Sequence, residues 1–588
     1  MKKIYIPFLL AIAAIFPSCN QDRLDIEQKG VTAIETFYQT DADCEAALVA
    51  AYANFANKVC SQNGGSIYVP FRAAYNLCGD DMYAAGEFFG DNDFMAALNE
   101  FRYDSSSAVL TNAYKNIFLA MYPINLVIDK FKDGLPEGGQ TATTKRCVAE
   151  ARVLRAYLHM MLAIGWGNPP FVDHVLTGDA LPYNCDTDPE NPMTHDELLL
   201  WCAKECEAAL PDLDERKSTA DKEGVAKVTK GFANAVAGKA YLFAGNYAAA
   251  KSALNAVITS NKYALVPGEE FMDQFHIEGD CSAEKIFESN IQDNAAIGTW
   301  GGKIQRSTWM EANIWNWRSD HFVANPSSNY SSIDGWGGCG VPQSFADEFL
   351  ANDGPDSYRF NATMIHIDKV VYETEYGLDV DKLSLEEKKA SKDLGIDGRG
   401  LYGQSFYLPL KPICRIADLL NRGNNVRMNN YTIMRYAEVL LMYAEACVQT
   451  GDAASALKVV NDIQKRAGSK TISTSVDMGV IEKEKKYELW LEGCRWADMV
   501  RWGHLDGAKQ AGQAVPILYD KLTRAPKADD QGLAWENGSE ANSRFYTVIT
   551  HEAKDKGYDI GYKDKNKYFP FPYSATSINP NLTQHEGF

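Results

Sequence analysis

The chain has 588 residues, a length that exceeds a single compact core and predicts several units or one elongated array. Its content of 46% hydrophobic and 11% aromatic residues excludes a disordered protein. The formal net charge of −20 argues against a nucleic-acid partner, because phosphate backbones are bound by clustered cations.

The N-terminus predicts export. Met1-Lys2-Lys3 precedes an apolar run over 4–16 and then Pro17-Ser18-Cys19, the pattern of a secretory signal peptide. The run is shorter than the roughly 20 residues that span a bilayer. Cys19 directly after Ser18 resembles the lipobox of a bacterial lipoprotein, which implies acylation of Cys19 and a lipid anchor. The alternative is an ordinary signal peptide with an incidental cysteine.

Helical periodicity dominates the next part of the chain. Apolar stripes of period 3.6 predict helices over 41–57, 110–131, 146–164, 194–209, 435–448 and 480–502. Two helix–turn–helix units share their turn chemistry, with Gly245-Asn246 in the first and Gly451-Asp452 in the second. Small residues after each turn let the paired helices approach closely, as in a tetratricopeptide hairpin.

The residues between these two units have a different composition. Residues 271–430 are rich in Gly, Asn, Pro, Ser and aromatic residues, with one short charged helix expected near 384–392. We therefore predict a mainly α fold, in which discontinuous tetratricopeptide-like repeats form an α–α superhelix with a large loop-rich insertion that contains short strands. The predicted organisation is a leader at 1–18, an N-terminal helical-repeat region at 19–270, a ligand-binding insertion at 271–430, C-terminal repeats of the same scaffold at 431–504 and a loop-rich region at 505–588.

Several motifs in a fixed order resemble one family over nearly the whole chain. They are Leu24-Asp25-Ile26 and 40–52 near the start, 150–157 with 165–170, the helix 435–446, the motif Glu484, Glu488, Glu492, Arg495, Asp498 and 501–503, and the ending 569–572 with 579–584. The chain is similar to SusD/RagB-type outer-membrane nutrient-binding lipoproteins. Lys485 stands where the family usually has Arg.

The resemblance implies a function and a partner. Members of this family capture a substrate at the cell surface for a SusC-like TonB-dependent outer-membrane transporter. We therefore expect a lipid-anchored outer-membrane protein, exposed at the cell surface, that binds an oligosaccharide or polysaccharide. The charges of the 484–501 motif are expected to pair within the helical scaffold. Glu484, Glu488 and Glu492 share a helix face, and the pairs Glu488–Arg495 and Arg495–Asp498 lie within reach of neighbouring turns.

A cluster of tryptophans marks the candidate ligand site. Five of the 11 Trp lie within 300–336, and sugar rings stack on aromatic planes while nearby polar groups bind hydroxyls. A second segment, 71–103, adds polar and aromatic residues. The residues proposed to contact ligand are Trp309, Asn313, Trp315, Trp317, Arg318, Trp336, Asp81 and Tyr83. The alternative for the tryptophans is a local core, and for Asp81 and Tyr83 a helix cap and a half-buried aromatic.

We expect no enzyme activity, because the sequence has neither H-E-x-x-H nor G-x-S-x-G. No cofactor is expected; Asp91-Asn92-Asp93 offers oxygen ligands for a structural calcium ion but lacks the EF-hand frame. The 12 cysteines other than Cys19 form no CxxC pair, and their spacing names no disulfide. Three alternatives stay open: an oligopeptide-capturing lipoprotein of the same architecture, a surface glycoside hydrolase, whose carboxylate pair would be defined only in three dimensions, and a purely structural assembly subunit, which burial of every aromatic residue in 300–336 would favour.

Overall fold

The fold was analysed in a computed structural model. The structure describes residues 37–60, 70–86, 93–290, 316–317, 335–366, 369, 407–413, 415–419, 428–504 and 561–588. The predicted leader, Cys19 and the short helix expected near 384–392 lie outside these residues. The domain boundaries given above stay predictions.

The N-terminal half is built of long helices. These are α2 (Asp41–Val59), α3 (Pro70–Leu77), α4 (Asp93–Asn99), α5 (Ala108–Phe131), α6 (Ala142–Trp166), α7 (His195–Ala209), α8 (Lys230–Phe243) and α9 (Tyr247–Thr259). Three begin with a reciprocal capping box, at Thr40, Thr141 and Thr194, in which each threonine hydroxyl accepts from a backbone N–H that the helix leaves unpaired. The predicted helices 41–57, 110–131, 146–164 and 194–209 correspond to α2, α5, α6 and α7.

The two predicted hairpins are present. Gly245 and Gly451 adopt φ of 73° and 79°, a left-handed conformation that glycine enters without a steric penalty. The next residue caps the second helix in each case, because Asn246 accepts from the Ala249 N–H and Asp452 from the Ser455 N–H. The second hairpin consists of α15 (Tyr436–Gln449) and α16 (Ala453–Arg466).

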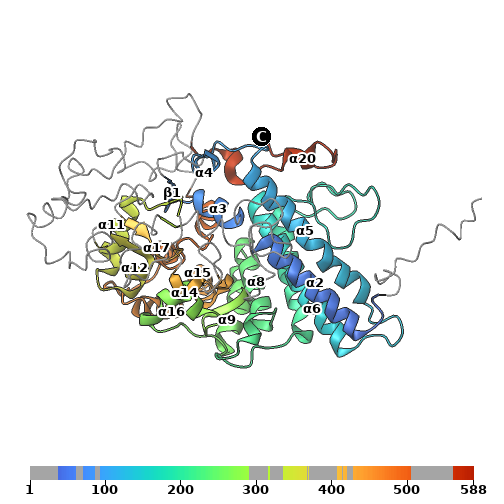
Figure 1. The fold of residues 1–588 in the computed structure, drawn as a ribbon, viewed down its shortest axis with the longest axis horizontal. Coiled ribbons are helices and arrows are strands. Elements are labelled where there is room, and N and C mark those ends of the chain that lie inside the picture. The colour runs from blue at the N-terminus through green and yellow to red at the C-terminus, as the bar shows by residue number, and fades with distance from the viewer. Residues whose placement is uncertain are drawn as a thin grey trace, which may run out of the picture.

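The helices pack in a continuous series. Along the chain α5, α6, α7, α8 and α9 each contact the next, and α9 then packs against α15 although the insertion separates them in sequence. Figure 1 shows α2, α5 and α6 on one side, α8 and α9 in the middle, and α15 and α16 beyond them. The mainly α fold of discontinuous tetratricopeptide-like repeats is confirmed.

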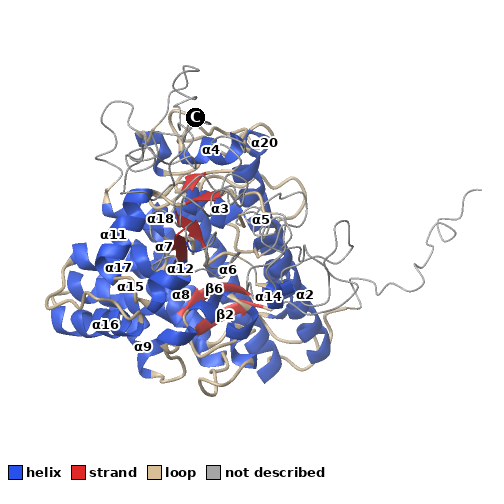
Figure 2. Cartoon of the chain, turned by 60° about the vertical axis from the view of Figure 1, so that its left-hand side comes forward, coloured by secondary structure: helices blue, strands red, loops and turns tan. Residues whose placement is uncertain are grey.

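Short elements between the repeats make up the described part of the insertion. They are β2 (Lys285–Ser289), β3 (Cys339–Gly340), α11 (Gln343–Asp353), α12 (Tyr358–Thr363), β4 (Met364–His366), β5 (Tyr407–Pro409), α14 (Ile416–Leu419) and β6 (Tyr431–Arg435). The strands form two-stranded antiparallel sheets, β2 with β6, β4 with β5, and β3 with β1 (Tyr83–Ala84). In Figure 2 these short strands lie among the helices and form no extended sheet.

One predicted helix is two helices in the structure. The stripe over 480–502 is divided into α17 (Met478–Glu488) and α18 (Arg495–Trp502). Leu491 and Gly493 between them have φ of 61° and 81°, which no right-handed helix can contain. Glu492 therefore lies in this connection and not on the helical face predicted for it.

The C-terminal residues pack back onto the first helices. Residues 561–588 contain the short helix α20 (Tyr573–Thr576), and Phe569 and Phe571 are buried. Phe569 stacks on Trp496 with ring centroids 4.4 Å apart, and the Trp166 indole N–H donates to the Pro570 carbonyl oxygen at 3.0 Å. The C-terminal motif thus connects α6 with α18.

Candidate functional site

The two segments predicted to bind ligand meet in a small sheet. Strand β1 pairs with β3 in antiparallel register, Tyr83 opposite Gly340 and Ala84 opposite Cys339. The Ala85 N–H donates to the Gly338 carbonyl oxygen at 3.2 Å, which extends the pairing. The pairing therefore places the N-terminal segment beside the insertion, close to Trp336 in sequence.

The two described tryptophans of the cluster have different environments. Trp336 is half-buried, whereas Trp317 is completely buried. The Trp317 indole N–H donates to the Pro409 carbonyl oxygen at 3.1 Å, and a Cβ added to Gly335 would lie 2.2 Å from the Trp317 carbonyl oxygen. These contacts give Trp317 the packing role that was the alternative to ligand binding, and Trp336 is the described ring with an accessible surface.

Asp81 and Tyr83 are also buried. The Tyr83 ring lies against Gly340, where an added Cβ would approach it to 2.3 Å. Asp81 is 1% exposed, and its Oδ2 has no hydrogen-bond partner among the described residues. Burial, with the adjacent charge of Asp80, raises the pKa of Asp81 to about 7. In this conformation neither side chain reaches solvent, and the Tyr83 ring packs against Gly340 of β3.

The remaining predicted contacts lie outside the described residues. They are Trp309, Asn313, Trp315 and Arg318, and they stay predictions. The described part of the candidate site therefore consists of the β1–β3 sheet, the partly accessible Trp336 three residues before β3, and the buried side chains of Trp317 and Tyr83.

Acidic and basic side chains of the insertion and of the helical repeats form a cluster that we call the buried ionic cluster. Its members are Glu284, Asp353, Arg359, Lys411, Arg435, Arg466, Glu484, Glu488 and Glu492. Arg359 from the insertion pairs with Asp353 at 2.9 Å and with Glu484 and Glu488 from α17. The cluster thus connects the insertion to the helical repeats.

Glu488 is at the centre of this cluster. Its carboxylate accepts from Arg435 at 2.7 Å, from Arg359 at 3.0 Å and from Arg466. Burial opposes ionisation, but Arg466, Arg435 and Arg359 together outweigh it and hold the Glu488 pKa well below its usual range. The prediction that the motif carboxylates pair within the scaffold is confirmed, with partners far away in the sequence.

Arg495 has a different partner from the one expected. Its guanidinium forms a bidentate pair with Asp80, at 2.6 Å from Nε to Oδ1 and 2.9 Å from Nη2 to Oδ2. Burial disfavours the Asp80 charge, yet Arg495 and Lys486 lower the Asp80 pKa overall. This ion pair connects α18 to the segment that follows α3, next to Asp81. The motif therefore also stabilises the backbone beside the candidate site.

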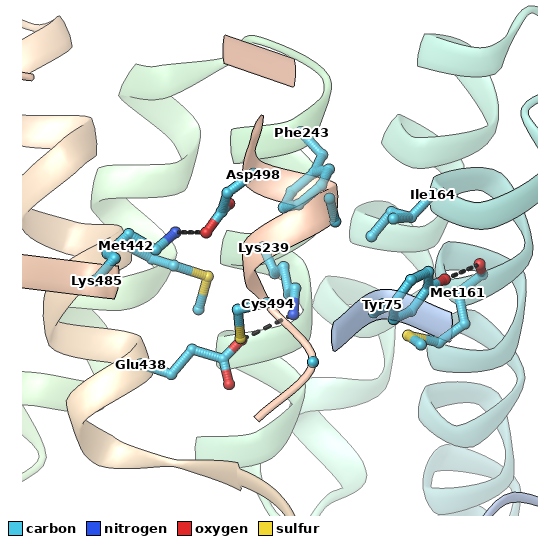
Figure 3. Close-up of a pocket in the computed structure, with 12 residues that line it drawn as sticks. Tyr75, Met161, Ile164, Lys239, Phe243, Glu438, Met442, Lys485, Cys494 and Asp498 are labelled. Atoms are coloured by element: carbon cyan, nitrogen blue, oxygen red, sulfur yellow. Dashed lines mark hydrogen bonds and ion pairs between the residues drawn. The ribbon is translucent and has the colours of Figure 1, made fainter. Parts of the chain in front are cut away.

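A small cavity lies inside the repeats and is shown in Figure 3. Its volume is about 30 Å³, and two ion pairs line it: Lys239 with Glu438 at 2.8 Å, and Lys485 with Asp498 at 2.6 Å. This volume suits a water molecule and not a sugar ring. Lys485, which replaces the Arg expected from the resemblance, thus takes part in a buried ion pair with Asp498.

Two larger hollows have the volume of small-ligand sites, and sequence analysis missed both. One, of about 330 Å³, lies between α5, α6 and α7 and includes Lys132, Lys145 and Arg155. The other, of about 410 Å³, combines Phe243 and Tyr568 with polar groups at the start of α7 and the end of α18. The residues that line each hollow come together only through helix packing, so no local sequence pattern predicts either hollow.

Within the described ranges, no group of three or more His, Cys, Asp or Glu side chains is arranged to hold a metal ion. Within the same ranges, no helix combines the length and the apolar character needed to cross a membrane.

Comparison with known proteins is consistent with this architecture. Residues 310–588 match the model of the SusD family. A SusD-like protein of Bacteroides ovatus is 23% identical, with 97% of this chain and 96% of the relative covered, and SusD-like protein P38 of Formosa agariphila is 23% identical, with 90% and 98% covered. Over residues 310–588 the chain thus matches the SusD family, and the relatives that it resembles over nearly its full length are SusD-like proteins.

Solved structures share the SusD-family fold over nearly the full chain. Surface glycan-binding protein A of Bacteroides thetaiotaomicron, solved in complex with laminarihexaose, aligns with a TM-score of 0.67 at 20% identity and covers 93% of this chain and 100% of its own. A laminarin-binding SusD-like protein aligns with a TM-score of 0.66 at 20% identity, covering 94% and 100%. The mainly α, tetratricopeptide-like fold is therefore common to these proteins.

Proposed function

We propose that this SusD-like chain is a non-catalytic, lipid-anchored protein of the outer membrane that captures a glycan at the cell surface and delivers it to a SusC-like TonB-dependent transporter. The observation that carries the proposal is the full-length likeness to glycan-binding members of the family. The leader ending at Cys19 supports the anchor. The tryptophan cluster supports a sugar as the ligand, because rigid aromatic faces pack against the C–H faces of sugar rings.

The glycan is proposed to bind at the β1–β3 edge. Trp336 offers a partly accessible ring there, and Trp309, Trp315, Asn313 and Arg318 belong to the same stretch of sequence. Trp317, Tyr83 and Asp81 are buried and are not accessible to a ligand in this conformation. Because two relatives bind laminarin or laminarihexaose, a β-linked glucan is the first ligand to test.

Isothermal titration calorimetry with laminarihexaose, a maltooligosaccharide and a mixed oligopeptide pool tests the ligand class. We expect Trp336→Ala and Trp315→Ala each to weaken binding of the active glycan about tenfold or more, as for a central aromatic anchor. Tyr122→Ala is the matched control, since Tyr122 is 56% exposed on α5. Binding of peptides but of no glycan would show that the ligand is a peptide. Wild-type affinity in both tryptophan variants would contradict the proposed binding site.

Two further measurements test the remaining parts of the proposal. Chromatography of the incubated glycan should recover it unchanged, and release of shorter products would identify a hydrolase. Detergent extracts of outer membranes should yield the transporter together with the tagged chain. Recovery of the chain without any TonB-dependent transporter would contradict the delivery step.

A further inference from the structure

Two cysteines face each other across the interface of α2 and α6. Cys44 and Cys147 are both fully buried, and their thiol groups lie close enough together for each to shift the pKa of the other. Both are free thiols in the structure. Because α2 and α6 are packed together, this contact joins two elements that are about 100 residues apart in sequence.

Polar contacts at the start of both helices fix the position of the pair. The Thr141 hydroxyl donates to Asp41 Oδ1 at 2.6 Å, and Arg146 Nη2 pairs with Glu45 Oε1 at 2.7 Å. Asp41 and Glu45 lie on either side of Cys44 in α2, and Thr141 and Arg146 both precede Cys147. The two thiols are therefore held in register by their neighbours.

A third contact continues the same register further along the helices. The Tyr52 hydroxyl donates to Glu150 Oε2 at 2.6 Å, and Arg146 holds the other oxygen of Glu150 at 2.8 Å. These contacts between α2 and α6 thus run from the first turn of α2 to its middle, and Cys44 and Cys147 lie between the first and the last of them in sequence. A bond between them would follow the existing packing of the helices.

The local charges favour thiol chemistry at Cys147. The neighbouring thiol of Cys44 and the nearby positive charge of Arg146 lower the Cys147 pKa despite its burial. A thiolate is the nucleophile of disulfide exchange, so the cysteine with the lowered pKa is the one that attacks. Cys44, whose pKa is raised, supplies the second sulfur.

We propose that Cys44 and Cys147 form a disulfide that joins α2 to α6 in the exported protein. The inference uses the export part of the proposed function and is independent of the ligand. While the chain folds, before the two thiols are enclosed, the Cys147 thiolate attacks an oxidant that contains a disulfide, and the Cys44 thiolate then displaces the reduced oxidant from the mixed disulfide. One S–S bond forms in the protein, two protons leave its thiols, and the oxidant takes up the two electrons as a dithiol or as two thiols.

Such a bond would act where the chain leaves its anchor. Helix α2 is the first described helix after the predicted lipid on Cys19, and α6 lies at the centre of the N-terminal repeats. A cross-link over a long loop restricts the unfolded chain strongly. The disulfide would keep α2, the first described helix after the predicted lipid anchor, attached to α6 when a force acts on that anchor.

Differential alkylation of the full chain tests the proposal without any substitution. Protein purified from an exporting host is unfolded in iodoacetamide without reductant and digested with trypsin. We expect peptide 147–152, which follows Arg146, to be found joined to peptide 30–58, and to be released by reductant. Recovery of both peptides alkylated before reduction, or of Cys147 joined to a different cysteine, overturns the proposal.

A pair on a single helix is the internal control. Cys202 and Cys206 are buried one turn apart on α7, where a bond would join no second element, so we expect both to be alkylated in the unreduced sample. Thermal unfolding adds a functional readout: reductant should lower the Tm of the wild type but not that of Cys147→Ser, with Cys202→Ser behaving like the wild type. Equal Tm values with and without reductant in the wild type contradict the bond. A chain that binds glycan normally with free thiols would refute this inference alone.

Discussion

Replacing Glu488 with glutamine removes one negative charge from the centre of the buried ionic cluster while preserving the side-chain volume. In the native protein the carboxylate accepts from three arginines, at 2.7 Å from Arg435, at 3.0 Å from Arg359 and at short range from Arg466. An amide can accept through only one of its two ends. Its NH₂ group would face a guanidinium, and positive charge would be left uncompensated in the core.

The expected loss is about 3–5 kcal/mol of unfolding free energy, the cost of breaking a buried ion pair by removing one partner. We expect the lower half of that range, because Glu284 and Glu492 still pair with Arg435 and Glu284 with Arg466. The effect should shrink on acidification. The folded pKa of Glu488 lies below its unfolded value, so its stabilisation is complete above about pH 4.3 and is lost as the pH falls toward the folded pKa.

Urea unfolding at pH 7 and pH 3.5, followed by far-UV circular dichroism, measures both effects. Asp462→Asn is the matched control, because Asp462 pairs with Lys458 on the exposed face of α16 and such i,i+4 pairs contribute only about 0.3–0.5 kcal/mol. A Glu488→Gln variant that unfolds within about 1 kcal/mol of the wild type at pH 7 would refute the assignment of Glu488 as the centre of the cluster.

Three further predictions concern separate parts of the molecule. Asp81→Asn should raise the Tm at pH 8 more than at pH 5, because the folded pKa of about 7 makes ionised Asp81 increasingly destabilising as the pH rises above the unfolded pKa near 4. Equal shifts of the Tm at the two pH values would contradict this prediction. Gly238→Val should lower the unfolding free energy measured in urea by about 1–3 kcal/mol, because its Cβ would lie 2.4 Å from Leu254, whereas Gly479→Ala, whose nearest contact is 3.3 Å away, should leave it unchanged. Equal urea midpoints for the two variants would show that α8 and α9 can move apart. Cys19→Ala should move the chain from the membrane pellet to the soluble fraction, and unchanged sedimentation would exclude a lipid at Cys19.

The helical frame could be predicted from local sequence because its determinants are local. The stripes over 41–57 and 146–164 match α2 and α6 to within a few residues at either end, and the glycine turns at 245 and 451 lie where they were expected. Capping threonines and apolar spacing act within one or two helical turns, so reading a single segment is enough. The break after Glu488 was missed because the apolar stripe continues through it, while Leu491 adopts a positive φ that no sequence pattern indicated.

The candidate site could be predicted only in outline. Two segments were expected to contribute, and the pairing of Tyr83 with Gly340 brings them together. Burial, however, depends on the whole fold: composition alone could not distinguish the enclosed Trp317 from the partly accessible Trp336. Long-range ion pairs posed the same problem, since the spacing of Arg495 suggested a neighbour along the helix and its partner is Asp80 from the far end of the chain.

The pairing of β4 with β5 bears on how binding specificity can diversify in this scaffold. His366 lies opposite Tyr407, so the polypeptide departs and returns at adjacent points, and the adjoining backbone is fastened by hydrogen bonds from Leu410 and Lys411 to the Thr363 carbonyl oxygen. Loop-closure entropy grows only with the logarithm of length. The number of residues between β4 and β5 can therefore change at little cost in closure entropy, while the pairing that brings the two strands together is kept.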